Sequence, residues 1–268
     1  MRNQIFLAPV PTGRWHSAWH QLHYLAGQRA CKLDLHQDFS GQQTLDHTQA
    51  IWSFGMDRAL IDTYSGSVPR YTSYPTAPHF HPGIDTSVYA GWLANLGLGQ
   101  SLSLYVHIPY CDRLCWFCAC HTKHTLQYAP VAQYLKALHR EIETVGHHVS
   151  PGAIVTSLHF GGGSPTMMRP DDLVDLMQHL KSCFTFAPGA DISVEMDPND
   201  LDEGRFDALA EIGMTRASLG IQDFDPKVQD AINRIQTFEQ TRHVVESVRR
   251  RGVGSVNCDV LYGLPYQT

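Results

Sequence analysis

Four cysteines lie close together between Cys111 and Cys120, and the first three, Cys111, Cys115 and Cys118, are spaced C-x3-C-x2-C. Cysteine thiolates are the usual protein ligands of iron–sulfur clusters, and soft sulfur favours such clusters or zinc over hard cations. Three thiolates from one short loop can hold three irons of a cubane [4Fe–4S] cluster, which leaves the fourth iron open to a small molecule. The spacing therefore favours a cluster-binding loop.

Two other interpretations of these cysteines remain open from the spacing alone. Structural zinc normally joins ligand pairs that are far apart in the sequence, and no second C-x2-C pair stands out here. Free or redox-active thiols are the other alternative, whereas a disulfide framework needs an oxidising compartment. Cys183 and Cys258 lie singly inside apolar runs and are expected in the core.

The composition indicates a globular protein that binds neither nucleic acid nor a membrane. Hydrophobic residues make up 43% of the 268 residues, and the formal net charge is −6. There is no long Lys/Arg run to attract nucleic acid, no run of about 18 apolar residues to span a membrane, and no signal peptide. We expect a cytoplasmic protein, because a reducing compartment suits an oxygen-sensitive cluster.

The chain divides into three parts by composition. Residues 1–55 are rich in His, Gln and Trp and lack a sustained period, so we expect an atypical, poorly ordered extension, whose expression the sequence leaves open. Residues 56–100 are expected to form an N-terminal arm, in which prolines between 64 and 82 forbid a helix. Residues 101–268 form the core.

Strands and helices alternate through this core. Apolar runs predict strands at 103–108, 154–160, 192–197, 217–222 and 255–262. Helical periodicity or flanking stop signals predict helices at 131–149, 171–184, 203–212 and 237–251. Such alternation means a parallel sheet with right-handed crossovers. We therefore expect an α/β fold in which five parallel strands form a partial parallel (β/α) barrel.

The unusual residues fall at or just past the carboxyl ends of these strands, which is where parallel barrels carry their chemistry. The glycines of Gly161–Ser164 let the backbone approach a ligand closely, or simply form a tight turn. A carboxylate inside an apolar strand is costly unless it is paired. Glu195 therefore predicts binding of ribose hydroxyls or an amine, with a salt bridge as the alternative, and Asp259 is placed similarly.

Three further residues near the carboxyl ends of the strands could contact a ligand. Tyr105 and Phe117 could line an adenine site or belong to the core. Arg234, after Asn233, could clamp a carboxylate or remain a solvated surface residue.

With these residues in view, the chain resembles a radical S-adenosylmethionine enzyme, and more narrowly the oxygen-independent coproporphyrinogen III oxidase family. The resemblance covers about residues 60–268 and implies the partial barrel of that superfamily. It is carried by Pro69–Thr76, Tyr105–Pro109, the C-x3-C-x2-C-x-C run, Gly161–Pro165, Glu195–Pro198, Gly220–Phe224 and Asp259–Pro265.

The resemblance also implies roles for individual residues. Cys111, Cys115 and Cys118 would hold the cluster, and Cys120 would not. A first S-adenosylmethionine, on the cluster, would be bound by Tyr105, Phe117, Gly162 and Glu195. A second would be bound by Gly163, Ser164, Gln222, Arg234 and Asp259. No catalytic residue is assigned.

The implied reaction is the oxidative decarboxylation of two propionate side chains of coproporphyrinogen III, which gives protoporphyrinogen IX in haem biosynthesis by way of a 5′-deoxyadenosyl radical. It needs an electron donor and an electron acceptor of unspecified identity, and we expect a monomer. The alternative is a haem-binding chaperone of the same superfamily. The fourth cysteine and the N-terminal arm favour the oxidase.

The sequence departs from the family in two ways. Ser164 stands where Thr is more usual, Tyr110 replaces Phe and Ala119 replaces Gly. The larger departure is that the chain stops at Thr268, before the family's last core strand and C-terminal domain. We therefore expect the 268-residue chain to bind iron and to cleave S-adenosylmethionine slowly, but not to form protoporphyrinogen by itself.

Overall fold

The computed structural model describes residues 5–9, 59, 62–63 and 77–268. The chain separates into two units, one made of residues 1–16 and 86–268 and the other of residues 17–85. The described residues of the second unit include the 3-10 helix η1 (Ala77–His79). Every residue predicted to bind a cofactor lies in the first unit, which is therefore the one that matters for function.

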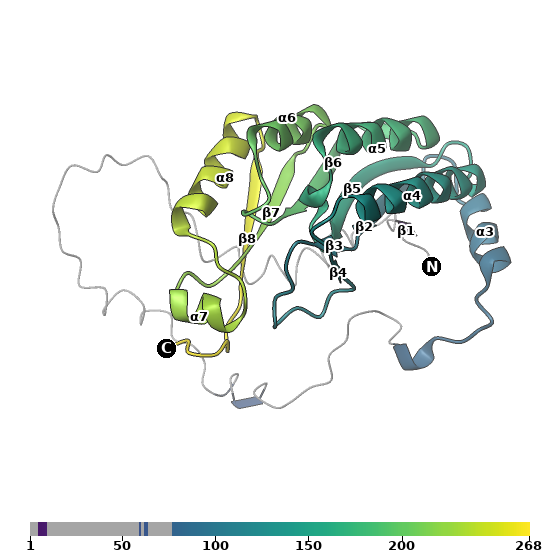
Figure 1. Ribbon diagram of the computed structural model, residues 1–268. Coiled ribbons are helices and arrows are strands. Elements are labelled where there is room, and N and C mark those ends of the chain that lie inside the picture. The colour runs from purple at the N-terminus through teal and green to yellow at the C-terminus, as the bar shows by residue number, and fades with distance from the viewer. Residues whose placement is uncertain (1–4, 10–58, 60–61, 64–76) are drawn as a thin grey trace. The chain divides into compact units, whose positions relative to one another are not determined.

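Within the described residues, a six-stranded sheet forms the centre of the first unit (Figure 1), in the order β1-β2-β5-β6-β7-β8. The strands are β1 (Ile5–Pro9), β2 (Ser101–Ile108), β5 (Ile154–Gly162), β6 (Phe186–Met196), β7 (Arg216–Gln222) and β8 (Ser255–Val260). Neighbouring strands from β2 to β8 all pair in parallel. This confirms the predicted α/β fold with five parallel strands.

The sixth strand, β1, was not predicted. It pairs with β2 in the antiparallel sense, with Ile5 opposite Val106 and Pro9 opposite Leu102. A strand of five residues is too short to establish a period inside the His- and Gln-rich segment 1–55. The rest of that segment and the arm residues 64–76 lie outside the described residues, so their predicted character stays a prediction.

Helices connect the parallel strands and lie together on one side of the sheet (Figure 1). They are α4 (Ala129–His148), α5 (Pro170–Cys183), α6 (Glu203–Glu211) and α8 (Phe238–Arg250). All four were predicted, with small shifts at their ends. The start of α8 is fixed by a capping box, in which Thr237 and Gln240 each accept a hydrogen bond from the backbone N–H of the other.

The strands β2 and β7 and the second half of β6 alternate between a face buried under these helices and a face that carries polar side chains, whereas β8 at the sheet edge has no buried residue. In β2 burial changes at every residue, and the buried members are Leu102, Leu104, Val106 and Ile108. Across the sheet, Tyr105 lies opposite His159 and Glu195 opposite Ser218. Because alternate residues of a strand share a face, these polar side chains stand on the face opposite the helices. The strand register thus assembles the site.

Several features differ from the sequence predictions. The helices α3 (Thr86–Ala94) and α7 (Pro226–Ala231) were not predicted, and β6 begins six residues before the predicted strand at 192. Pro188 and Gly189 lie inside β6 and normally interrupt a strand. Cys258 was predicted to be in the core but is exposed, because it lies on β8 at the edge of the sheet, whereas Cys183 packs against the core.

None of the described helices is both long enough and apolar enough to cross a membrane.

Candidate metal and cofactor site

The cysteine loop is closed at its base by two very short strands, β3 (Tyr110–Cys111) and β4 (Lys123–His124), which pair in parallel. The Lys123 N–H donates to the Pro109 carbonyl over 2.7 Å, and the Thr125 N–H donates to the Cys111 carbonyl over 3.0 Å. Inside the loop, the Cys118 N–H donates to the Cys115 carbonyl over 3.1 Å. The loop is therefore held where β2 ends.

This loop faces a cavity of about 270 Å³, which the carboxyl ends of β5, β6, β7 and β8 also line. The cavity gathers every residue predicted to bind the cluster or S-adenosylmethionine except Tyr105. These are Cys111, Cys115, Phe117, Cys118, Gly162, Gly163, Ser164, Glu195, Gln222, Arg234 and Asp259. Cys120, which was predicted not to be a cluster ligand, lines it as well.

Burial favours the protonated form of three thiols of the loop, those of Cys111, Cys115 and Cys120. Burial, followed by repulsion from Cys118 and Cys115, raises the pKa of Cys111 to about 12. Burial also raises the pKa of Cys115, against the opposing effect of a hydrogen bond from Arg234. Burial and the neighbouring Cys118 raise the pKa of Cys120 to about 11. Metal binding must therefore displace protons from these side chains.

Among the described residues, no three His, Cys, Asp or Glu side chains converge closely enough to hold one metal ion. A cubane places each thiolate on a different iron, so its ligands stand further apart than the ligands of a single ion. The loop geometry is thus compatible with a cluster.

The glycine run at the end of β5 packs against β3 more closely than a side chain would allow. The Gly163 N–H donates to the Ile108 carbonyl and the Ser164 N–H to the Tyr110 carbonyl, both over 2.8 Å. A Cβ at Gly163 would lie 2.6 Å from the Tyr110 carbonyl oxygen. Gly162 has a φ of 119°, a conformation that side chains disfavour. The run therefore holds Cys111 in place while exposing backbone to the cavity.

Glu195 accepts a hydrogen bond on each carboxylate oxygen. Nε2 of His159 lies 3.0 Å from Oε1, and the Gly162 N–H donates to Oε2 over 3.1 Å. The Glu195 side chain is still 43% exposed at the cavity. Because a carboxylate has about four lone-pair positions, Glu195 can accept further hydrogen bonds from the hydroxyl or amino groups of a ligand.

The Ser164 hydroxyl is used inside the protein. It donates to Oδ2 of Asp200 over 2.7 Å and lies 2.8 Å from Oγ1 of Thr166. Burial raises the pKa of Asp200 to about 6, with the charge of Asp197 adding to the rise and the Ser164 hydrogen bond opposing it. The hydroxyl to which the resemblance gives a ligand role therefore already ties the glycine run to the loop after β6.

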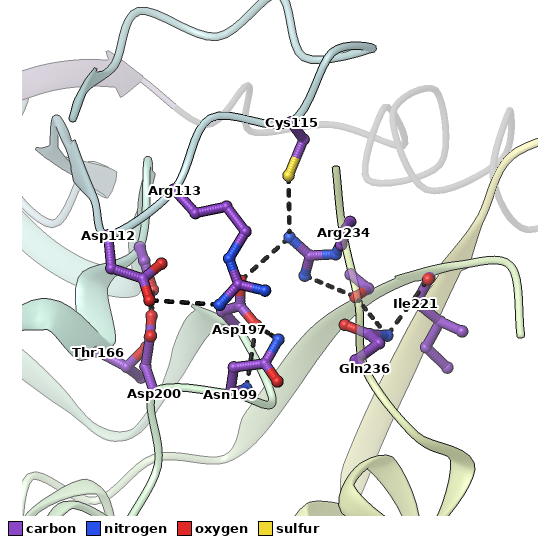
Figure 2. Close-up of polar contacts among 12 residues, drawn as sticks. Asp112, Arg113, Cys115, Thr166, Asp197, Asn199, Asp200, Ile221, Arg234 and Gln236 are labelled. Atoms are coloured by element: carbon purple, nitrogen blue, oxygen red, sulfur yellow. Dashed lines mark hydrogen bonds and ion pairs between the residues drawn. The ribbon is translucent and has the colours of Figure 1, made fainter. Parts of the chain in front are cut away.

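Arg234 reaches three groups at the floor of the cavity (Figure 2). Its Nη1 lies 3.1 Å from Oδ2 of Asp197 and 3.6 Å from Sγ of Cys115. Its Nη2 donates to the Gly220 carbonyl over 2.7 Å. Its Nε is buried and has no hydrogen-bond partner among the described residues. A buried donor of this kind normally has a partner, so Nε is an unsatisfied polar atom of the site.

Asp259 forms a second carboxylate group in the cavity. Ser218 Oγ donates to its Oδ2 over 3.2 Å, and Asn257 Nδ2 donates to its Oδ1 over 2.8 Å. Since β8 and β6 flank β7, Asp259 and Glu195 are separated by two strand spacings, or roughly 10 Å. Glu195 and Asp259 therefore stand on separate strands of a cavity that Asp112 and Asp197 also line.

Tyr105 does not line the cavity. Its ring stacks on His159, with centroids 5.6 Å apart, and its hydroxyl lies 3.0 Å from Nδ1 of His107. Through His159 it supports Glu195, so it stands one residue behind the cavity wall.

Sequence reasoning missed three polar residues near the site, namely His159, Asp200 and Gln236. Strand alternation could have placed His159 on the face of Tyr105 and Glu195. Asp200 lies in the irregular segment after β6 and Gln236 in the one between α7 and α8, and neither carries such a signal. Gln236 is buried, and its Nε2 lies 3.2 Å from each of the Gly220 and Ile221 carbonyls.

These residues fit an iron–sulfur cluster with an S-adenosyl ligand. Thiols supply cluster ligands, glycines leave room for a ligand against the backbone, and carboxylates suit ribose hydroxyls and an amino group.

Comparison with known proteins points in the same direction. The model of the Radical SAM superfamily matches residues 105–268. The oxygen-independent coproporphyrinogen III oxidase of Paracoccus denitrificans is 48% identical over 207 residues, which are 77% of this chain and 46% of that protein. The Escherichia coli protein of the same name is 41% identical over 215 residues, which are 79% of this chain and 46% of that protein.

A solved structure agrees as well. Coproporphyrinogen III oxidase from Escherichia coli, described as a Radical SAM enzyme, superposes with a TM-score of 0.72 at 37% identity. The match covers 79% of this chain and 47% of that one. The chain spans about half the length of the curated relatives it matches. The family match takes in the cysteine loop and more than half of the chain. The chain therefore belongs to the Radical SAM superfamily, whose members bind a [4Fe–4S] cluster and S-adenosylmethionine.

Proposed function

We propose that this protein catalyses the oxygen-independent oxidation of coproporphyrinogen III to protoporphyrinogen IX. One observation carries the proposal: a chain 48% identical to a relative of that name gathers its cysteine loop, glycine run and Glu195 around one cavity. Each of two propionate side chains would lose a hydrogen atom, carbon dioxide and one electron, which leaves a vinyl group. An electron acceptor is therefore needed, as well as the reductant that starts the reaction.

In this proposal Cys111, Cys115 and Cys118 hold the cluster. When bound, the cluster and S-adenosylmethionine supply a radical that can abstract the propionate hydrogen. Glu195 binds the ribose or the amino group of S-adenosylmethionine, oriented by His159 and by the Gly162 N–H. The protein's contribution is to position the reactants and to keep water away from the radical.

We further propose two S-adenosylmethionine sites in this cavity. Phe117, Gly162 and Glu195 serve the first, with Tyr105 supporting it through His159. The second uses Gly163, Ser164, Gln222, Arg234 and Asp259. The separation of Glu195 from Asp259 by two strand spacings supports two sites. Because the Ser164 hydroxyl is already bonded to Asp200 and its N–H to the Tyr110 carbonyl, this residue would shape the second site by lining it.

The proposal also covers the cellular location, the oligomeric state and the partners of the protein. We place it in the cytoplasm, where reducing conditions protect a cluster, in a monomer that meets coproporphyrinogen III and separate electron-transfer partners. The charge of −6 and the absence of a long basic run in the sequence support the view that nucleic acid is not a partner.

A segment exchange tests the reaction. The part of the Paracoccus protein that matches this chain over 207 residues is replaced by the matching segment of this chain. The chimera is reconstituted anaerobically and supplied with coproporphyrinogen III, S-adenosylmethionine, a reductant and an electron acceptor. We expect 5′-deoxyadenosine and protoporphyrinogen, and neither product from the same chimera with Cys115→Ala. The 268-residue chain is assayed in parallel.

Haem binding without formation of 5′-deoxyadenosine would instead assign the segment to the haem-chaperone branch. Cleavage of S-adenosylmethionine without any change in coproporphyrinogen would keep the radical chemistry and overturn the substrate.

A further inference from the structure

The apex of the cysteine loop is held by one short segment, Ile232–Ile235, which follows α7 and lies more than a hundred residues later in the sequence. The Trp116 N–H donates to the Ile232 carbonyl over 3.0 Å. The Asn233 Nδ2 donates to the Leu114 carbonyl over 2.8 Å, and Arg113 Nη1 donates to the Ile235 carbonyl over 3.3 Å. These bonds surround Cys115 on both sides.

Asn233 stands out within this segment because of its backbone. Its φ is 55°, in the left-handed region, and its N–H donates to the Asp230 carbonyl over 3.1 Å as the chain leaves α7. Asn tolerates this conformation better than most residues with a side chain. Glycine would adopt this conformation more easily but has no side-chain amide to donate a hydrogen bond. The aspartate side chain has no donor at neutral pH. The position therefore combines a backbone requirement with a donor requirement that asparagine meets.

We infer that Asn233 is a positioning residue for the metal loop, and that the segment Ile232–Ile235 preforms the apex of that loop before the cluster binds. The base of the loop is fixed by β3 and β4, whereas the apex has no strand of its own. Tying Leu114 and Trp116 to the end of α7 fixes the backbone on both sides of Cys115. A preformed loop binds its metal with less ordering cost. This inference rests on the proposed function for the identity of the metal.

The test compares Asn233→Gly and Asn233→Asp with the unaltered 268-residue chain. Asn233→Gly keeps the backbone conformation and removes the amide, and Asn233→Asp keeps the shape and removes the donor. The matched control is Asn95→Asp, which makes the same change where Asn95 Nδ2 donates to the Gly91 carbonyl over 2.7 Å, at the end of α3. Two quantities are measured: amide hydrogen exchange in the cluster-free protein, and the rate of iron loss to a chelator after anaerobic reconstitution.

We expect both Asn233 variants to exchange the Trp116 amide about threefold faster, the range for one lost hydrogen bond, with helix α4 unchanged. Iron loss should accelerate by a similar factor, and Asn95→Asp should change neither quantity. If Asn233→Gly behaves like the unaltered chain, only the backbone conformation matters and the positioning role is wrong. Exchange needs no metal, so it decides the role of Asn233 even if reconstitution yields no iron–sulfur cluster, a result that would count against the proposed function alone.

Discussion

Arg234 and Asp197 form an ion pair beneath the cysteine loop, with 3.1 Å between Nη1 and Oδ2 and with side chains only 11% and 14% exposed. Asp197 also accepts hydrogen bonds from the backbone N–H and Nδ2 of Asn199, both over 3.0 Å. Removing one partner of a buried pair leaves an uncompensated charge, which costs about 3–5 kcal/mol. The pair therefore contributes to the stability of the site as well as to its charge.

We predict that Arg234→Met lowers the free energy of unfolding of the cluster-free chain by several kcal/mol, and that adding Asp197→Leu restores part of the loss. Denaturant titration of the single and double variants measures this. The control is Arg242→Met, which removes an exposed pair with Glu246 at 3.9 Å (61% and 56% exposed) and should cost about 1 kcal/mol or less. Equal losses for Arg234 and Arg242 would show that burial of the first pair has no energetic weight.

Gly163 and Gly91 should respond in opposite ways to replacement by alanine. A Cβ at Gly163 would lie 2.6 Å from the Tyr110 carbonyl oxygen, so β3 and the adjoining Cys111 must move. Gly91 lies inside α3, where an added Cβ would meet no neighbouring group within 4 Å, so alanine should stabilise the helix by about 0.5–1 kcal/mol. Melting temperature and bound iron are measured for both. A Gly163→Ala protein that retains full iron would mean that β3 can shift without disturbing the cysteines.

The sequence predicted those helices and strands in which the spacing of apolar residues repeats over enough positions to be detected. The five parallel strands and the helices α4 and α5 have such a repeat, whereas α6 and α8 were indicated by the glycines that follow them. The strands β3 and β4 have two residues each and no period at all, yet they close the cysteine loop. Their pairing comes from tertiary contacts that the local sequence does not specify.

The site shows the same division. Residues at strand ends, such as Glu195 and Asp259, could be found because parallel strands bring their carboxyl ends to one edge. The pairing of Tyr105 with His159 could not, because it depends on the register between β2 and β5, which includes a shift between Leu102 and Ser103. A shift of one residue changes which residue of β5 lies opposite Tyr105, so this contact required the structure.

The cysteines of the loop should divide into three that are required and one that is not. Replacing Cys111, Cys115 or Cys118 by alanine removes a thiolate that the cubane needs, so anaerobic reconstitution should fail to give about four irons and four sulfides. Cys120→Ala should retain the cluster even though Cys120 lines the cavity. Iron and acid-labile sulfide are measured. One equivalent of zinc without sulfide would replace the cluster with a structural zinc site.

Asp200 should make the cluster-free protein less stable as the pH rises. Burial raises the pKa of its carboxyl from 3.8 to about 6, so between these values the folded chain binds more protons than the unfolded chain. The free energy of unfolding therefore falls as the pH rises through that window. Above about pH 6 the carboxyl is ionised in both states, and the loss of stability no longer grows.

Asp200→Asn removes this titration while keeping an oxygen to accept from Ser164. The variant should match the unaltered chain near pH 4 and exceed its unfolding free energy by on the order of 3 kcal/mol at pH 7, at about 1.4 kcal/mol per pKa unit. Denaturant titrations across this range measure the difference. A gap between the two proteins that does not change with pH would mean that Asp200 is ionised in the folded chain throughout.

Glu195→Gln separates the charge of this residue from its geometry. Glutamine has the same shape: its Oε1 can accept from the Gly162 N–H, and its amide can donate to Nε2 of His159 in the other tautomer. The fold and the cluster spectrum should therefore be unchanged. If the carboxylate binds the ribose or amino group of S-adenosylmethionine, losing the charge should weaken that binding by about 1–3 kcal/mol. Equilibrium dialysis against the reconstituted protein measures the dissociation constant. Glu195→Ala serves as the control that removes both contacts and should weaken binding further. A dissociation constant that is the same for glutamate and glutamine would leave Glu195 as a structural partner of His159 and Gly162.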